Sequence, residues 1–585
     1  MGPRPFMPRP TPATAVQERT PTGLSRDLPF YVAAVVLGAA LIVVTAIRQP
    51  FSYDELTQIN VYGSNSISVI TGATRQPPID PLLGALFQHI FGEGQLRQRL
   101  VPVLSGIGSL AMLAVLLRHL GLRFAGAFIV LLAATSPLVL RYSAYTRPYA
   151  LPFFLMLLAT YAAQRWLDDR HRGWLITAGV AAFVLPLVRV PEPTVFLLST
   201  AAVLAWFSYR GTLAWSRTKP LIVIDLAALL SMGLMQFFSL SSSAGGFFDP
   251  SPSGVVDRFP TGVHELATSF VGVLGSAFPW WPLTLLAVIA TLAIRPARER
   301  LFGWALWWPL LAAPVAFAIA YHFVNPFPFF ALPYRARAAS FFAPAFILAL
   351  AALAAVVERR EITGRIKVAV TALLAAVLVG QLPATADVVV NNAAPDFAVI
   401  SQVLKTRVPA DAIVLYDRPT PVGQSRQPFQ GTPRYMGDTP FTASVVDIPT
   451  HVDELPTSGP VYLLFNGQCA HAGRCVPGDR SAVDVSVPGW KIVYQQERFT
   501  LYAPISGQDG TSGVVTAMTD FADALGVRLG YLETYAAAAV LDHEGKSEEA
   551  KTLIAAMFAQ ASPGLSADIR EHDDKLDPFI VGSDD

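Results

Sequence analysis

Charge is the scarcest property of this sequence. Only 15% of its 585 residues are Asp, Glu, Lys or Arg, whereas a soluble protein carries about 25%. The net charge is +1, so no overall field attracts nucleic acid, which we exclude as a partner. Hydrophobic residues make up 53% of the chain and gather in runs of about 20, the length that crosses a bilayer. The composition therefore excludes an ordinary soluble protein and predicts a polytopic α-helical membrane protein.

Cysteine is almost absent as well. Cys469 and Cys475 are the only two, in GQCAHAGRCVPGDR. With His471 between them they remain one ligand short of a structural zinc site. The spans predicted below put this Gly-rich loop outside the cytoplasm, where a close cysteine pair is typical of a disulfide. We therefore favour a disulfide over a metal site, and a divalent metal is allowed by the sequence but not indicated anywhere in it.

The hydrophobic runs predict about eleven membrane-spanning helices. They are expected at 29–47, 101–117, 124–140, 148–166, 173–189, 193–208, 220–239, 281–295, 302–321, 338–357 and 366–386. Every second connection between them is basic, and short cytoplasmic connections carry an excess of Lys and Arg. One missed or invented span would destroy this alternation. The pattern therefore predicts a cytoplasmic N-terminus and an extracytoplasmic C-terminal part.

Three parts follow from this arrangement. Residues 1–27 are rich in Pro, Thr and Arg and are expected to be a disordered cytoplasmic tail. Residues 28–386 form the transmembrane domain. Its longer, Pro-rich and aromatic outer loops are 48–100, 240–280 and 322–337.

Residues 387–585 are predicted to form an extracytoplasmic α/β domain. Segments rich in β-branched and aromatic residues predict strands at 412–416, 461–465, 490–494 and 498–502. The domain is expected to end in a helical hairpin over 514–560, with the two helices joined at HEGKSEE.

An acidic pair, Asp54 and Glu55, directly follows the first predicted span in FSYDELTQIN. At the start of a helix expected at 54–71, such residues interact favourably with the helix dipole, by about 0.3–1 kcal/mol. Alternatively, a partly desolvated carboxylate at a membrane boundary makes a good general base, because burial raises its pKa. An isolated pair favours the first interpretation, and the neighbouring motifs favour the second.

The loop after the acidic pair carries further charges. TRQPPIDPLL places Arg75 and Asp80 on either side of two stiffening prolines. The apolar segment 81–91 that follows is too short to span a bilayer and suits an interfacial or re-entrant helix. Arg97 and Arg99 precede the second span and could snorkel to the interface. Arginines on the outer side run against the orientation rule, so they invite another explanation.

A third motif, SPLVLRYSAYTRPYALPFFL, forms a short outer turn after the third span. It combines Arg141 and Arg147 with Tyr145 and Tyr149. Arginine binds phosphate through a planar fork, and tyrosine suits the headgroup zone. An aromatic belt with interfacial arginines is the alternative interpretation of this turn taken alone.

In order along the chain, these motifs resemble the GT-C class of polyprenyl-phosphate-sugar-dependent glycosyltransferases. The similarity is greatest to the branch of bacterial lipid A aminoarabinose transferases and protein O-mannosyltransferases. It covers about residues 28–190 and recurs in YRARAASFFAPAF at 334–346. The chain departs from the pattern at Gln76-Pro77-Pro78, where many relatives have His-Pro-Pro, and at VRVPEPT, where many have a His-Tyr pair.

The resemblance implies a GT-C-like fold in the bacterial cytoplasmic membrane and an inverting sugar transfer on its outer face. Asp54 would be the general base, and Glu55 would support it or position the acceptor. Candidates for binding the donor phosphate are Arg141, Arg147, Arg189, Arg335 and Arg337. Candidates for lining the substrate are Tyr53, Arg75, Gln76, Asp80, Tyr145, Tyr149, Glu192 and His264. The alternative for His264 is the solvated face of an amphipathic helix.

The implied partners are a lipid-linked sugar donor and a glycolipid, polysaccharide or protein acceptor. No cofactor is required, because phosphate is already a good leaving group. The sequence gives no indication of the oligomeric state. Two rival hypotheses are a polytopic transporter and a non-catalytic scaffold for envelope assembly. A transporter would favour charged residues at mid-bilayer and repeated spans, whereas here the ionisable residues gather at the predicted outer boundary.

Overall fold

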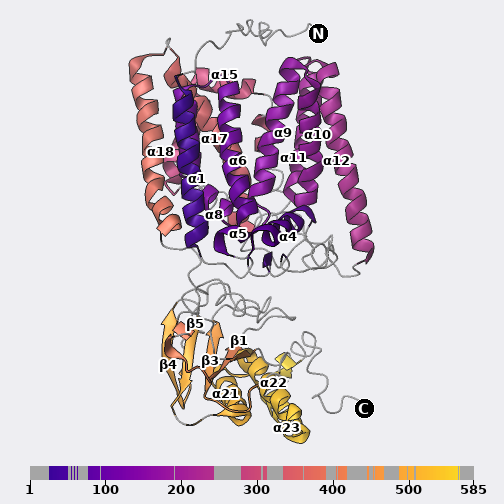
Figure 1. Ribbon diagram of the computed structural model, residues 1–585, viewed down its shortest axis with the longest axis vertical. Coiled ribbons are helices and arrows are strands. Elements are labelled where there is room, and N and C mark those ends of the chain that lie inside the picture. Colours follow the sequence, from indigo (N-terminus) through magenta and orange to yellow (C-terminus); the bar gives the residue numbers. More distant parts are fainter. Residues whose placement is uncertain are drawn as a thin grey trace.

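The computed structural model describes most of the helical part and the core of the C-terminal part. The described residues are 26–49, 55, 58–59, 62, 77–92, 94–189, 191–242, 279–304, 307–312, 334–359, 362–390, 403–404, 406–417, 444–446, 452, 455–466, 486–496, 499–505, 507, 509–563 and 565–566. Figure 1 shows a bundle of long helices with a sheet-containing domain beyond one of its ends.

Most helices of the bundle arise where the hydrophobic runs predict them. They are α1 (Leu28–Arg48), α6 (Leu100–His119), α7 (Phe124–Ala134), α9 (Ala150–Asp169), α10 (Arg172–Val188), α11 (Pro191–Tyr209), α12 (Trp215–Ser242), α14 (Trp281–Ala293), α17 (Tyr334–Glu358) and α18 (Gly364–Val390). Three further helices, α4 (Ile79–Phe91), α5 (Gln95–Gln98) and α8 (Pro137–Ser143), lie at the end of the bundle nearest the sheet (Figure 1). The protein is therefore a polytopic helical membrane protein with a C-terminal α/β domain.

By length and composition, three described helices can cross a membrane, namely α1, α6 and α18. The pair α7 and α8 adds a fourth if it is counted as one broken span. Several other apolar helices in the described part are shorter, among them α10 and α14. Parts of the expected spans lie outside the described residues, so the full count of about eleven stays a prediction.

One predicted span is broken in the structure, and one helix was not predicted. The span at 124–140 is broken, because α7 and α8 meet at an angle of 61°. Pro137 opens α8, and a proline there disfavours helical backbone at Ser136, which is extended. The span predicted at 302–321 is preceded by a helix that the hydrophobic pattern missed, α15 (Arg295–Gly303), because its sequence RPARERLFG is mostly polar.

The N-terminal tail and five basic connections are joined at one end of the bundle. An ion pair links the N-terminal tail to the α6–α7 connection. Further contacts link the α6–α7 segment to the α9–α10 connection, to the segment after α14 and to the end of α17. Another hydrogen bond links the α9–α10 and α11–α12 connections. The contacts are Arg118–Asp27 at 3.5 Å, His119–Asp168 at 2.8 Å, Arg300 Nη2 to Leu120 O at 2.8 Å, Ala125 N to Glu358 Oε1 at 2.7 Å, and Arg170 Nη2 to Ser216 Oγ at 2.9 Å. The predicted alternation of basic connections thus corresponds to one physical face.

The C-terminal domain contains a five-stranded sheet in the order β2-β1-β3-β5-β4. The strands are β1 (Ile413–Asp417), β2 (Ser444–Val446), β3 (Val461–Asn466), β4 (Trp490–Gln496) and β5 (Phe499–Pro504). β1 is parallel to β2 and β3, and β5 is antiparallel to β3 and β4. The four predicted strands correspond to β1, β3, β4 and β5, whereas the three-residue β2 was too short to predict.

The helical end of the domain holds three helices where a hairpin of two was predicted. They are α21 (Gly510–Leu525), α22 (Val527–His543) and α23 (Ser547–Gln560). The additional break lies at Gly526, whose φ of 70° is left-handed and ends α21. Apolar side chains of α21 and α22 pack on the sheet core around Trp490 and Tyr502.

Candidate functional site

Glu55 of the predicted acidic pair is buried and bound to a buried arginine. Its side chain pairs with Arg99 through two hydrogen bonds, from Nε to Oε1 at 2.9 Å and from Nη2 to Oε2 at 3.0 Å. Arg99 is fully buried and Glu55 is 1% exposed. A bidentate guanidinium–carboxylate pair fixes the orientation of both side chains. Arg99, which the sequence suggested as an interfacial anchor, therefore does not snorkel.

The pair ties three segments together. Arg99 Nη1 also donates to the carbonyl oxygens of Ala46, at 2.8 Å, and Gln49, at the end of α1. Glu55 Oε1 accepts a further bond from Thr146 N, at 2.9 Å, in the turn after α8. The carboxylate thus holds the end of α1, the start of α6 and the Arg–Tyr turn at fixed positions.

Asp80 is a second buried carboxylate at this end, in α4. It is 2% exposed and its Oδ2 accepts a hydrogen bond from Tyr62 Oη at 3.2 Å. Gly84 allows this contact, because a Cβ there would overlap the Tyr62 ring. α4 has 13 residues and is too short to span a bilayer. Burial raises the pKa of Asp80 to about 6, against the lowering effects of the Tyr62 hydrogen bond and the nearby guanidinium groups of Arg147 and Arg189.

Arg147 and Arg189 are the cations of this site. Both act electrostatically on Asp80. The guanidinium carbon of Arg189 lies 4.5 Å from the centre of the Tyr149 ring, a cation–π geometry that holds the side chain over the ring. Tyr149 in turn packs against Tyr142, with ring centres 4.9 Å apart, and against Tyr145, at 6.0 Å. Residues from the turn before α9 and from the end of α10 therefore converge on α4.

The structure brings together Glu55, Asp80, Arg147, Arg189, Tyr145 and Tyr149 of the predicted site residues. Arg141 lies on α8 with an exposed side chain. The backbone of Glu192 lies in α11 and that of Arg335 and Arg337 in α17, but their side chains are outside the described part. Also outside the described residues are Tyr53, Asp54, Arg75, Gln76, His264, Cys469 and Cys475.

Sequence reasoning missed three residues of this network: Arg99 as the partner of Glu55, Tyr62 as the partner of Asp80, and Thr146. The only signal for Arg99 was its unfavourable charge on the predicted outer side. Tyr62 and Thr146 carry no signal, because an aromatic residue in a loop and a backbone N–H occur everywhere.

Among the described residues, no group of three or more His, Cys, Asp or Glu could hold a metal ion.

Comparison with known proteins gives a family match over part of the chain. Residues 75–235 match the family model of dolichyl-phosphate-mannose-protein mannosyltransferase. A search of curated protein sequences finds no match.

Solved structures with a similar overall arrangement have low identity. ArnT from Cupriavidus metallidurans bound to undecaprenyl phosphate is 13% identical, over 82% of this chain and 98% of ArnT, with a TM-score of 0.44. Its apo form gives the same identity and coverage and a TM-score of 0.45. The Archaeoglobus fulgidus oligosaccharyltransferase in complex with Zn and sulfate is 12% identical, over 81% of this chain and 73% of that one, with a TM-score of 0.42. Identities this low transfer no residue role to this chain.

The family match spans α4, the Arg–Tyr turn and the end of α10, which are the elements that build the site. Together with the polytopic helical architecture, this partial match indicates a membrane glycosyltransferase.

Proposed function

We propose that the chain transfers a sugar from a polyprenyl-phosphate donor to a hydroxyl group of an acceptor, with inversion at the anomeric carbon. The observation that carries this proposal is the convergence of Arg147, Arg189 and Tyr149 on the buried carboxylate Asp80. The site lies beside the anchored Glu55, at the end of the bundle opposite the basic connections. A lipid phosphate in the membrane and an acceptor from the aqueous side can both reach such a boundary.

Arg147 and Arg189 would bind the donor phosphate. The Arg189 guanidinium carbon lies over the Tyr149 ring, and the five N–H donors of a guanidinium point in several directions, so contact with the ring and binding of a phosphate are compatible. As the bond between the anomeric carbon and the phosphate oxygen breaks, negative charge develops on the leaving polyprenyl phosphate. Fixed cations stabilise that charge, and loss of one such contact typically costs about 2.7–4 kcal/mol in the transition state.

Asp54 would be the general base. In a single displacement, the acceptor hydroxyl oxygen attacks the anomeric carbon, its proton passes to Asp54, and the polyprenyl phosphate leaves on the opposite face. Glu55 is the neighbour of Asp54 and is anchored by Arg99 and Thr146. This anchoring supports a positioning role for Glu55, in which Glu55 fixes the backbone next to Asp54.

Binding of a phosphate should change the protonation of Asp80. Arg147 and Arg189 hold its pKa below the value that burial alone would produce. A bound phosphate neutralises these cations, so the pKa of Asp80 should rise and the carboxyl should take up a proton at neutral pH. Asp80 then faces the donor in its neutral form and does not repel the phosphate.

The proposed location is the bacterial cytoplasmic membrane, with the N-terminus in the cytoplasm and the site and the C-terminal domain outside. The network of basic connections at the opposite end supports this orientation, because cytoplasmic connections are rich in Lys and Arg. A glycolipid, a polysaccharide and a protein all remain candidate acceptors. A role for the C-terminal domain in acceptor recognition fits the position of its sheet beyond the same end of the bundle (Figure 1).

Complementation and binding test the proposal together. Cells that lack the protein are complemented with Asp54→Asn, Arg189→Ala or a matched control, Arg172→Ala, which changes an arginine at the basic end. Envelope glycans are compared by mass spectrometry, and each purified variant is titrated with undecaprenyl phosphate. We expect Asp54→Asn to lose transfer by about 10²–10⁴-fold but to bind the lipid normally. Arg189→Ala should lose binding, and the control should keep both properties. Normal glycans with Asp54→Asn would contradict the assignment of the base.

A further inference from the structure

An isolated carboxylate lies inside the bundle, away from the proposed active site. Asp225 belongs to α12, about 15 Å along the helix from its N-terminal end at the basic face, by the helical rise. Its surroundings in sequence, PLIVIDLAALL, are apolar. The residue is 6% exposed. An ionisable residue within a predicted span is costly and usually marks a functional site.

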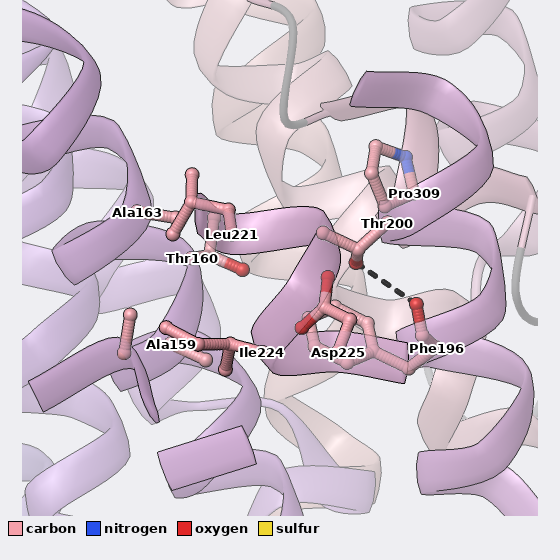
Figure 2. A pocket seen from close by; sticks show the side chains of 10 residues that line it. Ala159, Thr160, Ala163, Phe196, Thr200, Leu221, Ile224, Asp225 and Pro309 are labelled. Carbon is pink, nitrogen blue, oxygen red and sulfur yellow. Dashed lines mark hydrogen bonds between the residues drawn. The ribbon is translucent and has the colours of Figure 1, made fainter. Parts of the chain in front are cut away.

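Asp225 borders a small internal cavity. The cavity has a volume of about 20 Å³ and is lined by residues of α9, α10, α11 and α12 and by Pro309. Figure 2 shows the Asp225 carboxyl group, from α12, between the side chains of Thr160, from α9, and Thr200, from α11, with the Thr200 hydroxyl directed toward Phe196 O. The remaining lining side chains are apolar, so Asp225, Thr160 and Thr200 supply the polar side chains of the lining.

The Thr200 hydroxyl group is already engaged outside the cavity. The Thr200 hydroxyl donates its hydrogen to Phe196 O at 2.9 Å, so its oxygen presents only lone pairs to the cavity. Within the described part of the chain, Asp225 Oδ2 has no hydrogen-bond partner. Ionisation of the Asp225 carboxyl group therefore requires a positive group or an additional donor in this space.

We propose that Asp225, Thr160 and Thr200 bind one small monovalent cation, Na⁺ under physiological conditions. The cavity volume suffices for one water-sized occupant and excludes an organic cation. A water molecule alone would leave the carboxylate charge uncompensated in an apolar surrounding. Ca²⁺ takes 6–8 oxygen ligands, and Mg²⁺ keeps several waters, so neither fits one carboxylate and two hydroxyls in this volume. A single positive charge matches the single carboxylate.

The cation would join three helices, α9, α11 and α12, through oxygens that otherwise leave a charge buried among apolar side chains. Because it binds the folded protein and not the unfolded chain, it should raise the thermal stability in a saturable manner.

Thermal unfolding of the full-length protein in nanodiscs tests the site. Melting temperatures are measured in NaCl, KCl and choline chloride at equal ionic strength, for the wild type, Asp225→Asn and Thr200→Val. A matched control is Thr284→Val, which removes a buried hydroxyl from α14. We expect Na⁺ to raise the melting temperature of the wild type and of the control saturably. Asp225→Asn should lose this response, and Thr200→Val should need a higher Na⁺ concentration for half the effect.

Two results would overturn the proposal. Equal melting temperatures of the wild type in NaCl and choline chloride would show that no Na⁺ is bound, with a neutral carboxyl group and water in its place. A Na⁺ response that persists in Asp225→Asn would place the ion elsewhere. If Asp225→Asn does not fold, the comparison of the wild type in the three salts and the Na⁺ titration of Thr200→Val still test whether the site binds Na⁺.

Discussion

Replacement of Arg99 by Met should severely destabilise the protein. Met keeps much of the apolar stem but removes the guanidinium, so the Glu55 carboxylate remains buried without its partner. Both side chains are essentially inaccessible to solvent, and the carboxylate would lose both bonds from Arg99 while its bond from Thr146 N remains. Breaking a buried pair in this way costs about 3–5 kcal/mol. The bonds to the Ala46 and Gln49 carbonyls are lost as well, which places the expected loss at the upper end of that range.

A double-variant cycle separates the pair from its surroundings. Equilibrium unfolding in mixed micelles is measured for Arg99→Met, Glu55→Gln and the double variant. We expect the double variant to be less destabilised than Arg99→Met alone, because no unpaired charge remains. Arg97→Met, which changes an exposed arginine two residues away, serves as the control and should stay within about 0.5 kcal/mol of the wild type. A loss below about 1 kcal/mol for Arg99→Met, or strictly additive losses, would refute the reasoning.

Three further predictions concern stability. Burial raises the pKa of Asp80 to about 6. The contribution of this carboxyl group to stability is therefore fully present below the pKa that Asp80 has in the unfolded chain, and it is lost as the pH rises through 6. Asp80→Asn should therefore stabilise the protein by up to about 3 kcal/mol at pH 7.5 and by much less at pH 4.5, in pH-dependent melts; an equal effect at both pH values would contradict this. Gly84→Ala should displace the Tyr62 ring and lower the melting temperature. Gly303→Ala is the control, because a Cβ there meets nothing within 4 Å. Similar melting temperatures of the two variants would exclude close packing of Tyr62 on Gly84. Glu358→Ala removes the carboxylate that accepts hydrogen bonds from backbone N–H groups at the start of α7. It should lower the free energy of unfolding by about 0.5–2 kcal/mol in the same unfolding assay. An unchanged free energy of unfolding would argue against this cap.

The candidate site was predictable in part, because some of its residue types are unusual for their place in the sequence. Arginines and tyrosines concentrated in one short turn, and a carboxylate after two prolines, indicated Arg147, Tyr149 and Asp80 without any structure. The charge of Arg99 indicated a special role but no partner. Asp225 escaped the sequence analysis, although a single acidic residue inside a predicted span is itself a signal.

Hydrophobic runs and basic connections determined the helical membrane architecture and the common face of the connections, because both depend on composition over local segments. Chain contacts between distant segments decided the rest. Glu55 meets Arg99 across 44 residues and Thr146 across 91, and the cavity of Asp225 exists only where four helices and the Pro309 segment meet. Glu55 is paired, Asp80 has a raised pKa and Asp225 faces an internal space. These differences depend on burial and geometry, which arise only when the helices pack.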